Sequence, residues 1–513
     1  MYVRQLYQAM LGKNHTPAMS PDDNRMTSST PTATFRAATA VAASPSAWDL
    51  ARSAIERAIS TDAKTVLILG FTAPVADPLA WLSHHQGVPS MYWRARDGWE
   101  YAGIGATHVI AEQGPEAMRR AADQASLFMR DCVIHESSPQ PRRPRFFGGF
   151  AFDPQRANGA DWHDGGFGDA VLILPEAVYA RRDTQAYAFF SFEVTPRTTP
   201  DTLVDRLALL NQNYWNGFDA PSAPPPIFGV GVPSNDDDSL SWVAHSAKIL
   251  QQIKNGALDK VVLARRQSVP LRSEDYTSLN PWPVVASLRD FDPACYQYGF
   301  QISDRYAFIG ASPERLFRLS GRRLESEAVA GTIARGVDEE EDRLLGERLL
   351  ASAKDQLEHR YVVEAVQDGL AGLAVDDSNG ASSQLDLVRL RTLQHLRSIM
   401  SVDLRDDISV GEVLSTLHPT PAVAGVPRDK ACEAIRAHET DSRGWYGGPV
   451  GWIGADAAEF AVGIRSALLS SDMAWLYAGA GLVSGSVPED EWREIQDKLQ
   501  AFRSAVSSPR HTP

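Results

Sequence analysis

Cysteine is scarce in this chain, which has three in 513 residues. The three cysteines stand far apart and form no CxxC pair, at Cys132, Cys295 and Cys432. An odd number of isolated cysteines provides neither a disulfide framework nor a zinc site. Because isolated thiols are typical of a reducing compartment, we expect a cytoplasmic protein.

Long apolar runs and basic blocks are also missing. The longest apolar stretch, residues 65–82, is interrupted by two prolines and an aspartate, so we expect no membrane span. The formal net charge is -14 and no segment is rich in Lys and Arg, so the phosphates of a nucleic acid would be repelled. A small anionic substrate is compatible with this charge only where the site itself gathers cationic side chains or a metal ion.

Residues 1–46 differ from the rest of the chain in composition. They are rich in Ser, Thr, Pro and Ala, contain only Asp22 and Asp23 as acids, and lack the apolar core of a secretory signal. We predict a disordered tail. The same composition is compatible with a plastid transit peptide, and Met19 and Met26 are alternative start sites.

The chain as a whole has an ordinary globular composition, with 43% hydrophobic and 22% charged residues. The best candidate for an internal linker is the segment 220–239, which combines Pro, Gly and an acidic run. We place a boundary there, between an N-terminal part of the fold at 47–235 and a catalytic region at 236–508.

Apolar patterning predicts both strands and helices. Buried strands are predicted where β-branched and aromatic residues run together, at "KTVLILG", "AVLILP" and "AYAFFSFEV". Helical spacing then predicts a helix over 239–256 that ends at Gly256, followed by a strand that begins at Lys260. Successive antiparallel strands are predicted up to about 331, and one long helix from about 338 to 373. Strand clusters followed by long helices favour an α+β fold with the helices packed outside the sheets.

Acidic residues cluster in "PEDEWREIQDK", residues 488–498, where a helix is predicted to begin at about 487. On this helix Glu491, Glu494 and Lys498 fall on one face, at i, i+3 and i+7. A solvated helix start is the ordinary interpretation, because the macrodipole favours acids there. The glycine-rich stretch "YAGAGLVSGS" before the helix favours a second interpretation. Its backbone N–H groups would bind an anion, and Mg²⁺ would bridge that anion to the carboxylates of the helix.

Three further polar residues border predicted core elements. Glu358 lies next to the apolar side of the long helix, Lys260 opens a buried strand, and Glu314 follows a proline in a turn between two strands. In their ordinary interpretations, Glu358 is a member of an ion pair, Lys260 is an exposed lysine at a strand edge, and Glu314 lies in an exposed turn. In a buried pocket, a neutral lysine would act as a general base and a protonated glutamate as a general acid. Spacing alone does not bring these residues together.

A series of longer motifs resembles one family in content and in order. The motifs are "KVVLAR", "GASPERL", "AGTIARG", "SAKDQLEH", "LQHL", "LHPTPAVAGVP", "RGWYGGPVGW", "GIRSALL" and "YAGAGLVSGSVPEDEWREIQDKL". Their order is that of the chorismate-utilising enzymes, which include isochorismate, salicylate, anthranilate and aminodeoxychorismate synthases. The match is dense over about 240–505, and "FFGGFAFDP" resembles the N-terminal half of the family. The sequence departs from the family at Gln356, where Arg is frequent, and in its tail.

The resemblance implies an anthranilate synthase component I-like fold of the α+β class, with two packed antiparallel sheets, helices outside and the site between the sheets. It implies that Glu358 and Glu494 bind Mg²⁺, that Glu491 supports the metal, and that the ion clamps the ring carboxylate of chorismate. Arg465 and Tyr477 match residues that hold the enolpyruvyl carboxylate. The other matched substrate-binding positions are Gly331, Thr332, His395, Ala422, Gly479, Gly481 and Lys498.

Two positions indicate the branch of the family. Lys260 matches the base that activates water in the isochorismate and salicylate branches, whereas the aminating branches lack this lysine. Salicylate-forming enzymes typically carry Thr at the position of Ala422, so Ala favours stopping at isochorismate. With Glu314 as the general acid, the resemblance implies an isomerase, isochorismate synthase, serving menaquinone, siderophore or salicylate biosynthesis.

Alternatives remain open at this stage. A salicylate synthase would continue to pyruvate elimination, and an inactive homologue would bind chorismate without turnover. Because water is the expected nucleophile, we expect no glutaminase subunit, and we expect a monomer or a weak homodimer.

Overall fold

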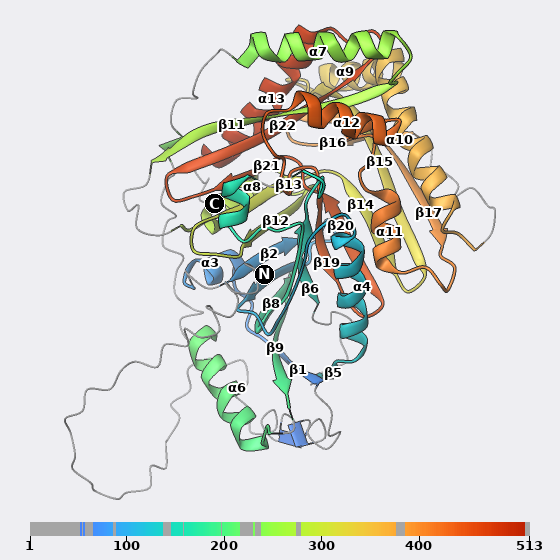
Figure 1. Cartoon of the computed structure of the whole chain (residues 1–513). Helices are drawn as coiled ribbons and strands as arrows, with labels where there is room; N and C mark the ends of the chain where they lie inside the picture. Colours follow the sequence, from blue (N-terminus) through green and yellow to red (C-terminus); the bar gives the residue numbers. More distant parts are fainter. Residues whose placement is uncertain are drawn as a thin grey trace, which may run out of the picture.

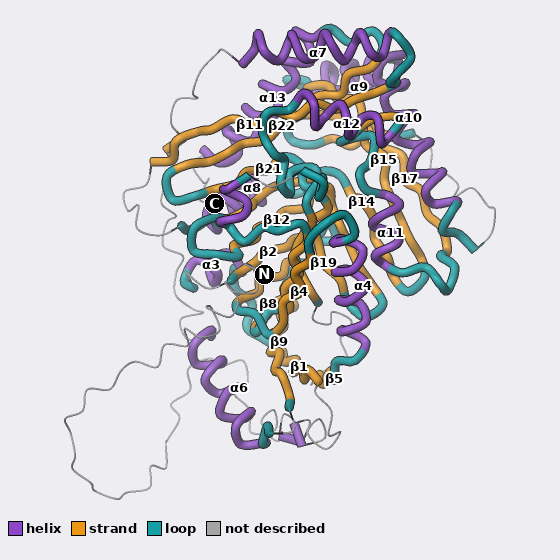
Figure 2. Tube along the Cα trace, viewed as in Figure 1, coloured by secondary structure: helices purple, strands orange, loops and turns teal. Residues whose placement is uncertain are grey.

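Strands with alternating apolar residues form two large β-sheets in the computed structural model (Figure 1). The structure describes residues 52–53, 55–56, 65–85, 89–136, 145–156, 159–195, 197–215, 229–230, 238–272, 279–375 and 385–507. Figure 2 shows the strands gathered in the interior and the helices around them.

The first sheet has thirteen strands within the described residues. In spatial order its main path runs through β10 (Gly229–Val230), β11 (Lys260–Arg272), β22 (Met473–Val483), β21 (Ser466–Leu469), β13 (Ala307–Ser312), β12 (Tyr296–Gln301), β2 (Ser90–Arg94), β3 (Glu100–Ile104), β8 (Ala177–Arg182), β9 (Gln185–Val194), β1 (Thr65–Thr72) and β5 (Val133–Glu136). The short strand β18 (Gly425–Val426) pairs with β11 beside this path. Among the described strands, only β1 and β5 pair in parallel.

The second sheet has nine antiparallel strands within the same residues. In spatial order they are β16 (Asp386–Arg389), β17 (Leu393–Asp403), β15 (Arg323–Ala334), β14 (Arg315–Ser320), β20 (Ala457–Val462), β19 (Pro449–Ile453), β6 (Phe146–Phe150), β7 (Ala170–Leu174) and β4 (His108–Glu112). Both sheets therefore combine strands from the N-terminal part and from the catalytic region. The boundary at 235/236 stays a prediction about the sequence.

An aromatic core joins the two sheets. Trp93 of β2 and Phe308 of β13, from the first sheet, share one buried cluster with Phe147 and Trp452 of the second sheet. Tyr92, the residue just before Trp93 on β2, belongs to a different cluster that extends under the helices. Because side chains alternate between the two faces of a strand, one face of each sheet packs on the other sheet and the opposite face packs on helices.

Helices surround the two sheets, most of them on the outer faces (Figure 1). They are α3 (Pro78–Ser83), α4 (Ala117–Arg130), α5 (Ala160–Asp164), α6 (Pro200–Trp215), α7 (Asp238–Lys254), α8 (Trp282–Phe291), α9 (Glu339–Ala351), α10 (Ala353–Ala371), α11 (Val410–Leu417), α12 (Arg428–His438) and α13 (Pro488–Ser507). Helix α10 packs on β15 and β17, while α13 packs on β22 and against α7 and α8. Within the described part of the chain, no helix is both long enough and apolar enough to span a membrane.

Two of the segments at which the chain crosses from one sheet to the other run side by side. Residues 313–314 lead from β13 to β14, and residues 463–465 lead from β20 to β21. The backbone N–H of Val462 donates to the carbonyl of Glu314 at 3.1 Å, and that of Ala311 donates to the carbonyl of Arg465 at 3.1 Å. We call these residues the crossing segments. They place Glu314 and Arg465 where the two sheets meet.

The predicted fold class, α+β with two packed antiparallel sheets, is confirmed. The single long helix predicted over about 338–373 is wrong, because Ser352 separates α9 from α10. Its backbone is extended, with φ -70° and ψ 112°, and its side chain accepts a hydrogen bond from the N–H of Asp355. A serine in this conformation caps a new helix instead of continuing the old one.

Two further predictions meet the structure in part. The helix predicted to end at Gly256 is α7, and Gly256 has φ +73°, as a glycine after a helix end requires. The strands predicted in succession up to 331 form two hairpins, β12–β13 and β14–β15, which belong to different sheets. The tail predicted at 1–46 and most of the linker predicted at 220–239 lie outside the described residues.

Candidate active site

One cavity gathers the polar residues that were singled out in the sequence. It has a volume of about 820 Å³ and is walled by β11, β15, β17 and β22, by α10 and α13, and by the crossing segments. All predicted site residues except Lys260 and Glu491 line it, namely Glu314, Gly331, Thr332, Glu358, His395, Ala422, Arg465, Tyr477, Gly479, Gly481, Glu494 and Lys498. The fold thus supplies the proximity that spacing alone did not.

Lys260 lies directly behind the cavity wall. It is the first residue of β11, pairs with Val483 of β22 and is 0% exposed. Its Nζ lies 3.0 Å from Oε1 of Glu358, a cavity-lining residue on α10. Since a buried ammonium group is costly without a counter-charge, this ion pair explains how β11 can begin with a fully buried lysine.

Gly481 of β22 makes this ion pair possible. A Cβ at this position would stand 2.5 Å from Oε1 of Glu358 and 3.2 Å from Cε of Lys260. The first distance is shorter than any real contact of a Cβ atom, so a side chain here would displace the carboxylate. The glycine therefore serves a close approach of side chains across the strand.

Helix α13 contributes two more carboxylates, each held by a lysine. Nζ of Lys498 lies 2.7 Å from Oε1 of Glu494, one turn earlier on the helix. Nζ of Lys354, on α10, lies 2.6 Å from Oε1 of Glu491. Within the described residues, no group of three or more His, Cys, Asp or Glu side chains is arranged to hold a metal ion. Glu358 and Glu494 are the two carboxylates of the predicted metal set that share the cavity.

The acidic helix start divides into two sides, as its spacing predicts. Glu491 is buried and Glu494 is half-buried, whereas Glu489, Asp490 and Asp497 are exposed. The adjacent apolar side is buried, at Ile495 and Leu499. This division excludes the interpretation in which the whole acidic run is solvated.

The carboxylates differ in their electrostatic surroundings. Burial raises the pKa of Glu358, but the positive charges of Lys260, Lys498 and Lys354 outweigh it, and the pKa lies below its ordinary value. Burial also raises the pKa of Glu491, and Lys354 offsets this only in part. Glu358 is therefore ionised at neutral pH and able to bind a cation.

Glu314 enters the cavity from the first crossing segment. The residue is 2% exposed, and its Oε1 has no hydrogen-bond partner within the described structure. Burial raises the pKa of Glu314 to about 8, and the negative charge of Glu327 also raises it, while the positive charges of Lys260 and Arg96 lower it. The side chain is protonated at neutral pH and can donate a proton to a group in the cavity.

A hydrogen-bonded chain crosses the cavity from Arg465 to Thr332. Nη2 of Arg465 donates to Nε2 of His395 at 2.6 Å, so Nδ1 carries the proton of the neutral ring. Nδ1 lies 3.1 Å from Oγ1 of Thr332 and 3.3 Å from the carbonyl of Gly331. Burial and the charge of Arg465 keep the pKa of His395 well below its ordinary value. His395 is therefore a neutral relay that fixes the guanidinium and the hydroxyl.

Two backbone features shape this part of the wall. Arg465 has φ +49°, a left-handed conformation that residues with a side chain rarely adopt and that is often found at functional sites. Gly331 has φ +76° and sits where the register between β15 and β17 shifts, between Ala330 and Thr332. The bulge turns this stretch of β15 toward the cavity.

Tyr477 and Lys498 complete the side of the cavity formed by β22. The ring of Tyr477 stacks on Tyr446, with centroids 5.1 Å apart and planes 18° apart. Burial raises the pKa of Tyr477, so its phenol stays neutral and remains a donor. Nζ of Lys498 donates to the carbonyl of Gly479 at 2.8 Å. Ala422 adds only a methyl group to the wall.

Sequence reasoning missed several residues of this cavity. Arg443 lines it and donates to the carbonyls of Val423 at 2.7 Å and Val262 at 2.8 Å, which fixes two wall segments. Asp355 lies near Glu358 and Glu494. Burial raises the pKa of Asp355, and the negative charges of these two carboxylates raise it further. The position of Asp355, three residues before Glu358 on a helix, was a usable signal for it.

A second cavity, of about 670 Å³, adjoins the first and shares Arg443 and Tyr477 with it. Tyr477 is the only predicted site residue in its lining. Arg266, one of the arginines in its lining, forms ion pairs with Asp161 and Asp441, each at 3.0 Å. The chemistry predicted from the sequence therefore belongs to the first cavity.

Comparisons with known proteins agree with this geometry. The family model described as chorismate binding enzyme matches residues 53–507. The salicylate biosynthesis isochorismate synthase of Pseudomonas aeruginosa is 34% identical over 474 residues, which cover 89% of this chain and 94% of that protein.

Solved structures show the same fold. The structure of MenF, the menaquinone-specific isochorismate synthase from Escherichia coli, superposes with a TM-score of 0.71 and 28% identity, covering 90% of this chain and 99% of that one. Anthranilate synthase component I from Streptococcus pneumoniae superposes with a TM-score of 0.58 and 19% identity, covering 85% and 92%. The second likeness bears on the fold alone.

Proposed function

Because this chain belongs to the family of chorismate binding enzymes, we propose that it is an isochorismate synthase, an isomerase that converts chorismate to isochorismate. The observation that carries the proposal is that two groups meet at one cavity: the carboxyl of Glu314 in its lining, and the side chain of Lys260 directly behind its wall, close enough for its charge to lower the pKa of Glu314. The reaction needs a base that activates water and an acid that protonates a leaving hydroxyl, and these side chains have the matching chemistry.

The residues present fit a Mg²⁺ ion as the resident cofactor. Mg²⁺ is commonly held by one or two carboxylates, together with water and oxygens of the substrate. Glu358 and Glu494 offer such a pair in the cavity, and the missing side chain of Gly481 leaves room beside the first of them. Bound there, the ion would supply positive charge for the ring carboxylate of chorismate and would take the place of Lys260 as counter-charge of Glu358. Glu491 would support this site from behind the wall.

The second carboxylate of the substrate, on the enolpyruvyl group, needs its own positive charge and hydrogen-bond donors. Arg465 and Tyr477 present a guanidinium and a phenol to the cavity, and His395 fixes the orientation of the guanidinium. We assign the enolpyruvyl carboxylate to these two donors. Lys498 contributes positive charge beside the ring carboxylate. These groups offset the formal charge of -14 on the whole chain at the one place where a dianion must enter.

The mechanism follows from the two catalytic side chains. Lys260, which is an ammonium ion while it neutralises Glu358, first releases that proton to solvent. As the free amine it then accepts a proton from a water molecule while the water oxygen bonds to ring C2. The ring double bonds shift, and the bond from C4 to its hydroxyl breaks. Glu314 donates its proton to that hydroxyl, which leaves as water. One water is consumed and one is released, so the net reaction is an isomerisation, and a proton returns from Lys260 to Glu314 before the next turnover.

A product assay tests the proposal. Purified protein supplied with chorismate and Mg²⁺ is expected to release isochorismate and no pyruvate, and EDTA is expected to slow turnover by roughly a hundredfold or more. Chromatography of the products, with an enzymatic assay for pyruvate, distinguishes the alternatives. Salicylate with pyruvate would establish a salicylate synthase, and chorismate binding without turnover would establish an inactive homologue.

A second prediction concerns the metal carboxylates. Glu494→Gln is expected to weaken Mg²⁺ binding by about tenfold or more, because an amide is a poorer ligand for a hard cation than a carboxylate. Titration calorimetry with Mg²⁺ measures this directly. Glu489→Gln is the matched control, since it makes the same change at an exposed position of the same helix. Equal binding by both variants would remove Glu494 from the metal site.

Four finer proposals accompany the function. Ala422 leaves the cavity without the hydroxyl that salicylate-forming relatives carry there, which favours release of isochorismate. No glutaminase subunit is required, because water is the nucleophile, and the protein acts as a monomer or a weak homodimer. We place it in the cytoplasm, where its free cysteines remain reduced, with a plastid as the alternative.

A further inference from the structure

The turn that carries Glu314 is held at each of its backbone polar groups. The hydroxyl of Ser312 accepts from the N–H of Glu314 at 3.2 Å and lies 3.3 Å from its carbonyl. The N–H of Val462 donates to that same carbonyl. The remaining carbonyl, that of Pro313, accepts a hydrogen bond from the guanidinium of Arg96. Arg96 lies between β2 and β3, in the N-terminal part of the chain, and no sequence motif pointed to it.

Glu327 fixes Arg96 in this position. Nη1 of Arg96 donates to Oε1 and Oε2 of Glu327 at 2.9 and 2.8 Å, and the carboxylate side chain is 1% exposed. Glu327 lies on β15, one strand from the turn, and also approaches Nη1 of Arg315 at 3.5 Å. The guanidinium of Arg96 lies over the ring of Tyr296, 4.9 Å from its centroid. Glu327 is therefore a buried carboxylate that needs a counter-charge, and the half-buried Arg96 brings one to it.

We propose that Arg96 and Glu327 form a positioning pair for Glu314, which holds the Pro313–Glu314 turn against the cavity and balances the charge around the catalytic carboxyl. The proposal rests on the assignment of Glu314 as the general acid. Neither residue lines the cavity. Both act through the turn, so they are positioning residues.

The charged groups facing Glu314 come from several elements, and they act in opposite directions. After burial, Lys260 of β11 and Arg96 lower the pKa of Glu314, and Glu327 of β15 raises it. Thr420 and Tyr446 are the other polar groups that interact with it. Removing only Glu327 or only Arg96 should therefore shift the titration of Glu314 in opposite directions, which general damage to the fold would not do.

The test compares the pH dependence of kcat in two variants. The alkaline limb reports loss of the proton from the general acid. Glu327→Gln is expected to move this limb down by about half to one pH unit, and Arg96→Met to move it up by a similar amount. The double variant should return the limb to its wild-type position. In all three, kcat should fall about ten- to a hundredfold with KM nearly unchanged, because the acid is displaced.

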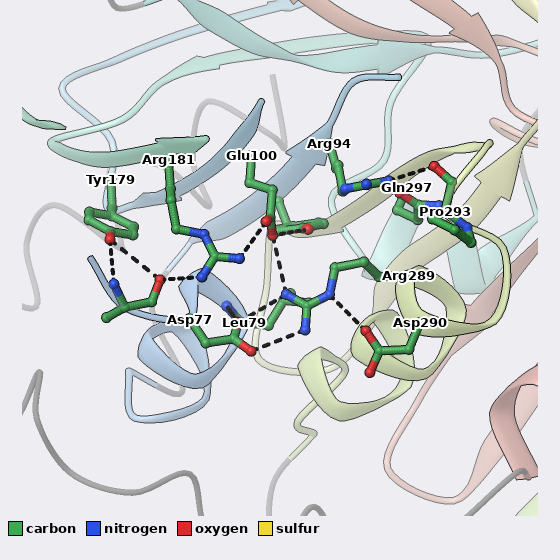
Figure 3. A network of polar contacts seen from close by, with 12 residues as sticks. Asp77, Leu79, Arg94, Glu100, Tyr179, Arg181, Arg289, Asp290, Pro293 and Gln297 are labelled. Atoms are coloured by element: carbon green, nitrogen blue, oxygen red, sulfur yellow. Dashed lines mark hydrogen bonds and ion pairs between the residues drawn. The ribbon is translucent and has the colours of Figure 1, made fainter. Parts of the chain in front are cut away.

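A matched control lies in the same hairpin. Glu100, the first residue of β3, is also a buried carboxylate between arginines, 2.6 Å from Arg181 and 3.2 Å from Arg289 (Figure 3). Its network contains α3 and α8 residues and not the turn of Glu314. Glu100→Gln should lower the melting temperature and leave the alkaline limb in place. Limbs of Glu327→Gln and Arg96→Met that coincide with wild type would overturn the positioning pair.

A measurement without turnover separates this proposal from the proposed function. The difference in unfolding free energy between each protein and its Glu314→Gln counterpart, followed against pH, reports the titration of Glu314 itself. Opposite shifts in the two variants support the pair even if chorismate is not converted. Identical titrations in wild type and both variants contradict the pair even if chorismate is converted.

Discussion

Lys260→Ala is expected to lower kcat by about a thousandfold or more while chorismate still binds in the presence of Mg²⁺. General base catalysis typically contributes about a hundred- to ten-thousandfold, and Lys260 is the one lysine among the described residues that is fully buried, at the first position of β11 beside the cavity. Arg465 and Tyr477, which we propose bind the enolpyruvyl carboxylate, are untouched, so substrate affinity should change little. Steady-state kinetics and calorimetric titration with chorismate measure the two effects separately.

The control for this prediction is a lysine that neutralises a carboxylate without facing the reaction. Lys354 lies on the same helix as Glu358 but pairs at 2.6 Å with Glu491, which does not line the cavity, whereas Lys260 pairs with Glu358, which does. Lys354→Met is expected to cost roughly tenfold or less. If both variants lost activity equally, Lys260 would be a counter-charge of the metal site and not the base.

Glu314→Gln is expected to lower kcat by about a hundred- to ten-thousandfold, because an amide cannot supply the proton that the C4 hydroxyl needs on leaving. In the wild-type enzyme, kcat should fall as the pH rises through about 8, where the carboxyl of Glu314 loses its proton according to its raised pKa. The residual activity of Glu314→Gln should not show this alkaline limb. A limb that persists unchanged in the variant would assign it to another group.

The same variant is expected to become more stable relative to wild type as the pH rises. Below the unfolded-state pKa of 4.5, Glu314 is protonated in both states and contributes no pH dependence. Between 4.5 and about 8, the unfolded chain releases the proton and the folded protein retains it, so wild-type stability falls with rising pH. Glutamine has no such loss. Between pH 5.5 and 8 the variant should gain about 2 to 3 kcal/mol relative to wild type in denaturant titrations.

The sequence indicated which residues form the candidate site better than it indicated how the fold brings them together. Helical spacing placed Glu491, Glu494 and Lys498 on one face of a helix, since a helix fixes the direction of side chains three and seven residues apart. The resemblance to the family supplied the other predicted site residues, because each of them lies in one of the motifs that match the family. Whether Lys260 comes to lie behind the wall of the cavity that Glu314 lines depends on the pairing of strands far apart in the chain, which no local pattern encodes.

Other features escaped for identifiable physical reasons. The break between α9 and α10 depends on a serine whose side chain caps a helix, while the apolar residues on both sides continue a helical pattern. Arg96 stands in a short turn between β2 and β3, and its importance comes from a carbonyl more than two hundred positions away. Gly481 was matched to a substrate-binding position, but its second role was not predictable, because Glu358 and Lys260, which meet beside it, lie on elements far apart in the chain.

The interleaved order of strands has a consequence for synthesis of the protein on the ribosome. Strand β2 pairs with β12, and β6 pairs with β19, so the N-terminal strands emerge from the ribosome long before their partners. Strand β22, among the last to be made, must insert between β11 and β21. Neither sheet can close before its late strands have been made, β20 in the second sheet and β22 in the first, and unpaired strand edges persist until then. Folding of this enzyme is therefore a late, whole-chain event in which chaperones have open edges to protect.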